Sequence, residues 1–82
     1  MATSDQQVQA LARVVRGALA TAGVQRIEVA KKTGIPQSTL GRRLGGSAEF
    51  TVHEFFRIAE VCGVPASELV ERSERLLEGE AA

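Results

Sequence analysis

The stretch RIEVAKKTGIPQSTLGRRLGG, residues 26–46, decides the fold of this chain. It joins two short segments with helical spacing across a tight turn that contains Gly34 and Pro36. Glycine can take the left-handed conformation that ends a helix, and proline is tolerated at the start of the next one. The pattern predicts a helix over residues 26–33 and a second from 36 or 37 to the following glycine pair. Together they form a helix-turn-helix.

The chain before this motif is also predicted to be helical. Over residues 5–22, apolar side chains recur at intervals of three and four and form one stripe, and Gly23 follows directly. No part of the sequence has the sustained alternation of β-branched residues that would indicate a strand. The predicted fold class is therefore all-α.

The chain after the motif begins with a well-marked helix start. Thr51 and Glu54 have the spacing of a capping box, and Phe50 is placed to pack against the first turn of the helix. Gly63 is expected to end this helix. A fifth helix follows and is expected to fray beyond Leu77. The complete prediction is a compact five-helix bundle.

The composition fits one small domain. Eighty-two residues can bury a single core, so we expect one helix-turn-helix domain over 1–82 with an ordered core of about 5–77. The hydrophobic content of 44% is ordinary for a globular protein, and no apolar run is long enough to span a membrane. The N-terminus lacks the features of a secretory signal, and one cysteine cannot form an internal disulfide. We therefore expect a cytoplasmic protein.

Charge is distributed unevenly although the formal net charge is zero. Residues 26–43 carry a local charge of +4, from Arg26, Lys31, Lys32, Arg42 and Arg43 against Glu28. Residues 60–82 carry a local charge of −4, because they contain six glutamates and two arginines. The positive charge gathers at the predicted helix-turn-helix, where a polyanion would bind.

The second helix of the motif has one apolar and one polar face. Leu40 and Leu44, four residues apart, are expected to point into the core. Four residues are then expected on the outer face: Gln37, Ser38, Gly41 and Arg42. Arginine and glutamine have forked groups that match guanine and adenine edges in the major groove, and serine can bond several bases. These four are the predicted base contacts.

Other residues are better placed for the DNA backbone than for the bases. The predicted backbone contacts are Arg26, Lys31, Lys32, Thr39 and Arg43. The glycine at position 41 costs about 1 kcal/mol of helix stability relative to alanine. Close approach to DNA would explain why a glycine stands there.

This chain resembles a known family over about residues 7–72. The resemblance is carried by residues 26–46, quoted above, and by FTVHEFFRIAEVCGVPASEL at 50–69. Both are similar to the lambda-repressor-like, Cro/C1-type helix-turn-helix domain. The resemblance implies a five-helix fold and sequence-specific DNA binding, with Gln37 and Ser38 at the start of the recognition helix. It also implies that Arg26 stands where many members have a glutamine that touches a phosphate.

The expected function is that of a transcriptional regulator, a bacterial or phage repressor that occupies an operator on double-stranded DNA. We expect a homodimer, for which a palindromic operator would supply two half-sites, with contacts from the last helix through Leu69, Val70, Leu76 and Leu77. An alternative is a protein-interaction module, such as an antitoxin or a phage accessory protein with the same fold. No catalytic group, metal site or cofactor is expected, since the only histidine and cysteine lack partners at suitable spacing.

Overall fold

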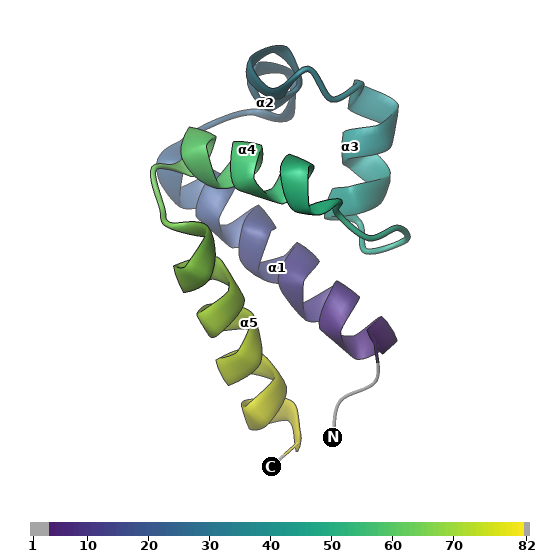
Figure 1. Ribbon diagram of the computed structural model, residues 1–82, viewed down its shortest axis with the longest axis vertical. Coiled ribbons are helices and arrows are strands. Elements are labelled where there is room, and N and C mark those ends of the chain that lie inside the picture. Colours follow the sequence, from purple (N-terminus) through teal and green to yellow (C-terminus); the bar gives the residue numbers. More distant parts are fainter. Residues whose placement is uncertain (1–3, 82) are drawn as a thin grey trace.

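Five helices follow one another through short connections in residues 4–81, the part of the chain that the computed structural model describes (Figure 1). Their bounds are α1 Ser4–Ala22, α2 Arg26–Thr33, α3 Gln37–Leu44, α4 Val52–Cys62 and α5 Ala66–Ala81. No strand occurs within these residues. The predicted all-α class and the predicted order of five helices are therefore confirmed.

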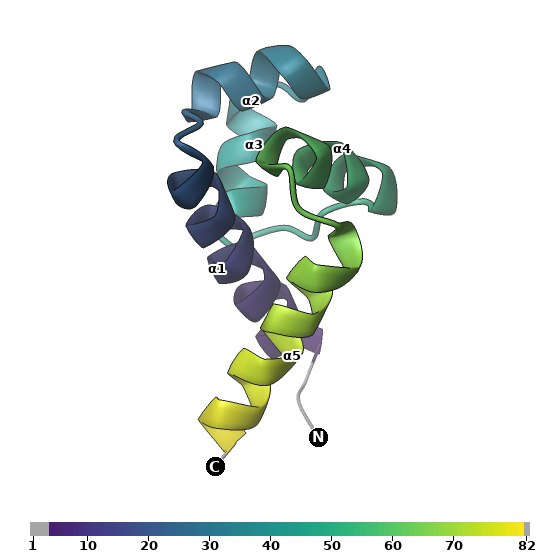
Figure 2. The same ribbon diagram turned by 90° about the vertical axis from the view of Figure 1, so that its left-hand side faces the viewer.

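The helices divide the molecule into two ends. α1 and α5 run side by side in opposite directions, so the two termini lie at the same end of the molecule (Figures 1 and 2). α2 and α3 lie together at the other end, and α4 crosses α1 between them. This arrangement leaves the helix-turn-helix at one extremity of a molecule that measures 38 × 22 × 19 Å.

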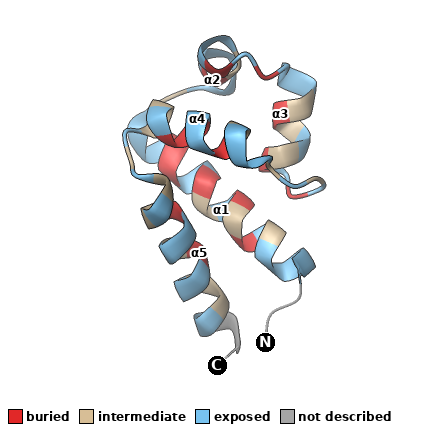
Figure 3. Ribbon diagram, viewed as in Figure 1, coloured by how far each residue is buried: buried red, intermediate tan, exposed pale blue. Residues whose placement is uncertain are grey.

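A single hydrophobic core joins all five helices (Figure 3). Each helix contributes at least one fully or almost fully buried side chain: Val15, Leu19, Val29, Leu40, Leu44, Phe55, Ile58 and Leu69. Burial of one such side chain contributes about 1.5–3 kcal/mol. Helices as short as α2 and α3 would not be stable alone, so this packing is what holds the motif in shape.

The start of α4 has the predicted capping box. The Thr51 hydroxyl accepts a hydrogen bond from the Glu54 N–H at 3.1 Å, and the Glu54 carboxylate accepts one from the Thr51 N–H at 2.9 Å. The Phe50 ring packs against the Phe55 ring, with centroids 6.3 Å apart, as expected for the residue before the cap. Gly63, in the left-handed conformation, ends the helix as predicted.

The end of α5 differs from the prediction. The helix continues to Ala81 rather than fraying beyond Leu77. Two ion pairs in the favourable order support it, Glu68–Arg72 at 3.1 Å and Glu71–Arg75 at 2.8 Å. α5 also packs along α1, and packing of this kind supplies most of the stability of a helix in a protein.

Candidate nucleic-acid interface

The turn between α2 and α3 is built around one buried hydroxyl. Thr33 Oγ1 donates a hydrogen bond to the Val29 carbonyl at 2.7 Å and accepts one from the Ile35 N–H at 3.2 Å. Gly34 takes the left-handed conformation, with φ of 77°, and its N–H bonds the Ala30 carbonyl. The Ile35 side chain is buried in the core. Every one of these contacts limits how α3 can lie relative to α2.

α3 is oriented by its two leucines. Leu40 and Leu44 are buried, as predicted. Gln37, Ser38 and Arg42 are exposed to solvent, and Thr39 and Gly41 are partly exposed. The predicted base-contacting side chains therefore lie together on the surface rather than under neighbouring helices of the same chain.

The beginning of α3 is uncapped, unlike that of α4. Pro36 occupies the N-cap position, and no side chain there bonds the first backbone N–H groups of the helix. These N–H groups and the positive end of the helix dipole lie beside Gln37 and Ser38. The start of α3 thus adds hydrogen-bond donors to the polar face.

The helix-turn-helix also carries cations that have no ion-pair or hydrogen-bond partner among the side chains described, residues 4–79. On α2 these are Arg26, Lys31 and Lys32, and on α3 the cation is Arg42; all four are exposed. Unpaired, exposed cations keep their full charge available to a polyanion. The predicted concentration of positive charge at the helix-turn-helix is thus present on its surface.

Arg43 is placed differently from the other cations. Its Nε lies 3.0 Å from Glu54 Oε1, and its Nη2 lies 3.5 Å from Oε2. Both side chains are largely buried, with exposed fractions of 19% and 17%. The guanidinium bound in this way lowers the pKa of the Glu54 carboxyl. Arg43 therefore already has a protein partner, although the sequence analysis placed it among the phosphate contacts.

Arg26 lies closer to α3 than sequence spacing indicates. A Cβ atom at Gly41 would stand 3.3 Å from Arg26 Nη1, tighter than an ordinary van der Waals contact. The Arg26 guanidinium therefore lies close to the middle of α3, at the position of Gly41.

Two side chains of α1 hold the end of α3. Arg16 Nη1 donates a hydrogen bond to the Leu44 carbonyl, and Gln9 Nε2 donates one to the Gly46 carbonyl at 2.7 Å. The first bond satisfies a backbone oxygen that the end of α3 leaves free, and the second bonds a carbonyl of the turn that follows. Neither residue could be predicted from the sequence, because nothing in the spacing of α1 shows which segment lies opposite them.

The predicted dimer contacts on α5 do not all lie on the surface. Leu69 is fully buried in the core and is therefore unavailable to a second copy, which corrects the sequence expectation for this residue. Leu76 and Leu77 are partly buried, and Val70 is exposed. The difference follows from helix geometry, since Leu69 and its neighbour Val70 point about 100° apart.

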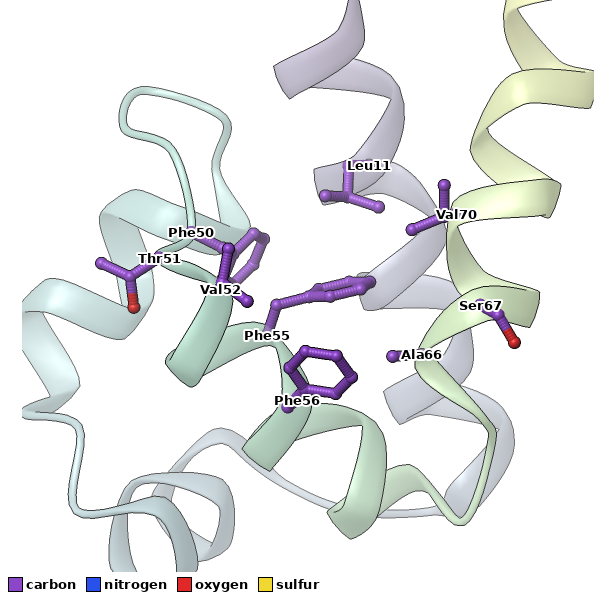
Figure 4. Close-up of a pocket in the computed structure, with 9 residues that line it drawn as sticks. All are labelled: Leu11, Phe50, Thr51, Val52, Phe55, Phe56, Ala66, Ser67 and Val70. Atoms are coloured by element: carbon purple, nitrogen blue, oxygen red, sulfur yellow. The ribbon is translucent and has the colours of Figure 1, made fainter.

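Val70 contributes to an apolar groove between α4 and α5 (Figure 4). The groove has a volume of about 540 Å³ and is also lined by Leu11, Phe50, Phe55 and Ala66. Its rim holds three large exposed hydrophobic side chains: Val52 at 73%, Phe56 at 55% and Val70 at 40%. Exposed apolar side chains that cluster in this way mark an interaction surface.

Other types of site have little support in the described residues. Burial raises the pKa of the Cys62 thiol, which opposes formation of a reactive thiolate. Within residues 4–81, no three side chains of the metal-binding types come close enough to hold an ion. None of the helices in this part of the chain has the length and apolar character needed to cross a bilayer.

Comparison with known proteins agrees with this geometry. The sequence profile of the helix-turn-helix family matches residues 15–69, more than half of the chain and within the range of the resemblance noted above. The chain therefore belongs to this family, in its lambda-repressor-like, Cro/C1 form. Comparison with curated proteins finds no match. Membership of the family makes the chain a DNA-binding transcription regulator of this type.

Proposed function

We propose that this protein is a sequence-specific repressor that inserts α3 into the major groove of an operator. The observation that carries the proposal is the orientation of α3: Leu40 and Leu44 are buried, while Gln37, Ser38 and Arg42 are exposed. A helix of this width fits the major groove, where base edges present distinct patterns of donors and acceptors. Bound there, the protein would block access of polymerase to a bacterial or phage promoter in the cytoplasm.

The residues have separate roles in this proposal. Gln37, Ser38 and Arg42 contact base edges. Gly41, which has no side chain, allows α3 and the DNA to approach closely. Lys31, Lys32 and Thr39 lie beside this face and contact phosphates, which contributes affinity without sequence preference. Arg43 fixes the position of α3 through its ion pair with Glu54.

A second copy of the chain is the proposed occupant of the groove between α4 and α5. An eight-residue recognition helix covers few base pairs, and two such helices on a two-fold axis would cover two half-sites. The formal net charge of zero gives two copies no overall repulsion. The rim residues Val52, Phe56 and Val70 would be covered in the dimer.

Selection of bound sequences from a random pool of duplex DNA tests the proposed function. We expect enrichment of one motif, and a dimer would give an inverted repeat with half-site centres about 10 base pairs apart, or a multiple of that spacing. Binding should weaken steeply as salt rises, because phosphate contacts release counterions. A pool that shows no enrichment at low salt would contradict the proposal.

The apolar groove also favours the alternative of a protein-interaction module with the same fold. In that case another protein, rather than a second copy, would cover the exposed ring of Phe56. A monomeric protein that enriches no DNA sequence would support this alternative over the repressor.

A further inference from the structure

Arg26 and Gly41 face each other across the helix-turn-helix. Arg26 is the first residue of α2, and Gly41 lies in the middle of α3, one turn after Gln37 on the same edge of the helix. Arg26 Nη1 lies 3.3 Å from the point that a Cβ on Gly41 would occupy, and the guanidinium carbon lies 4.0 Å from it. A Cβ at position 41 would therefore require the guanidinium to shift by a few tenths of an ångström.

Gly41 differs from the other glycines inside helices, Gly17 and Gly79, because only at Gly41 would a Cβ meet another side chain of the described residues. A glycine inside a helix is less favourable than an alanine, and α3 has only eight residues over which to recover that loss. The conformation of Gly41 does not require a glycine, because its φ is negative and lies in the ordinary helical region. Among the described residues, the Arg26 guanidinium is the group outside α3 that a Cβ at this position would approach.

The Arg26 guanidinium also has no partner in the described part of the protein. It forms no ion pair or hydrogen bond there, although Arg43 nearby on α3 is bound by Glu54. Its position over Gly41 places its donors at the middle of α3, on the helix that we propose enters the major groove. The forked donor set of arginine matches O6 and N7 of guanine.

We infer that Arg26 and Gly41 act as one recognition unit, in which the missing side chain of Gly41 lets Arg26 lie along α3 and bond a guanine of the operator. The inference rests on the proposed function and revises the role given there to Gly41, which now makes room for Arg26 rather than for DNA. It also replaces the sequence-based expectation that Arg26 contacts a phosphate. Arg26 is then a residue that determines specificity. Gly41 is a positioning residue that acts through Arg26.

The test uses the operator selected with the wild-type protein and all of its single-base-pair variants, with affinity measured by fluorescence anisotropy. Arg26→Ala should lower affinity for the operator at least about 5-fold and remove the preference for guanine at one position, leaving the other positions unchanged. Lys32→Ala is the matched control, since it removes one exposed cation from the same helix. It should weaken all variants of the operator by the same factor.

The coupling between the two residues is tested by a double-mutant cycle. Gly41→Ala should weaken the preference at the same position as Arg26→Ala, and it should have no further effect when Arg26 is already alanine. Circular dichroism should show that Gly41→Ala stays folded with an unchanged or higher melting temperature, since alanine favours helix. The loss of base preference is then not a consequence of unfolding.

Two results would overturn the inference while the proposed function stands. One is a uniform loss on all operator variants with Arg26→Ala, as for Lys32→Ala, which would mean a phosphate contact. The other is a loss of base preference by Gly41→Ala that is equally large when Arg26 is already alanine. That result would mean that DNA itself approaches the glycine. Failure of the wild-type protein to select any sequence would overturn the proposed function and this inference together, before any variant is compared.

Discussion

Arg43 in the last turn of α3 and Glu54 in the first turn of α4 are joined by an ion pair of 3.0 Å. The same carboxylate accepts a hydrogen bond from the Thr51 N–H and so also caps α4. One glutamate therefore caps the start of α4 and binds Arg43 of α3. In our proposal, the side of α3 that it holds faces away from DNA. The orientation of the recognition helix depends on this contact as well as on its buried leucines.

Stability should depend on pH through Glu54. Its pKa is lowered by the bond from Arg43, so its contribution is fully present above its ordinary value of 4.5 and is lost as pH falls through the lower folded-state pKa. Glutamine keeps the capping geometry but not the charge. Glu54→Gln should therefore reduce the free energy of unfolding by about 1 kcal/mol at pH 7, and the difference should shrink toward pH 3.

Urea unfolding followed by circular dichroism at both pH values measures this difference. Glu71→Gln is the control, because the Glu71–Arg75 pair is largely exposed and should contribute little. A difference between wild type and Glu54→Gln that stays constant from pH 7 to pH 3 would show that the ion pair does not stabilise the fold.

The Thr33 hydroxyl should be essential to the turn. Thr33→Val keeps the shape of the side chain but leaves the buried Ile35 N–H without its acceptor. A buried donor without a partner costs about 1–3 kcal/mol, and we expect a loss of unfolding free energy in this range. Thr21→Val, on the exposed surface of α1, is the control and should change stability by less than about 0.5 kcal/mol. Equal effects of the two substitutions would refute this role of Thr33.

Local signals predicted most of the fold. Thr51, Glu54 and Gly63 mark the ends of α4 through contacts within a few residues, and such contacts can be inferred from spacing. The spacing of Leu40 and Leu44 fixed the inward side of α3, and with it the exposure of Gln37, Ser38 and Arg42. These features follow from helix periodicity alone.

Features that depend on contacts between helices could not be predicted. The pairing of Arg43 with Glu54 requires the distance between α3 and α4, and the approach of Arg26 to Gly41 requires the crossing of α2 and α3. The burial of Leu69 depends on how α5 is rotated against α1. Neither distance nor rotation is encoded in the spacing of residues within one helix.

The groove between α4 and α5 should control the oligomeric state. Phe56→Lys places a charge on the exposed rim of the groove without disturbing the core, so it should convert a dimer to a monomer in sedimentation velocity. Ile27→Lys is the control, because Ile27 is also an exposed hydrophobic residue but lies on α2, outside the groove. A wild-type protein that remains monomeric both in solution and on its selected operator would contradict the proposed dimer.

The exposed face of α3 should contact bases through Arg42. The most direct test compares Arg42→Ala with wild type on the selected operator and on random duplex DNA, with Arg57→Ala as a control that removes another exposed cation. We predict that Arg42→Ala loses about 1–3 kcal/mol of binding free energy on the operator, loses the preference at one base pair, and binds random DNA much as wild type does. An equal loss on operator and random DNA would contradict it.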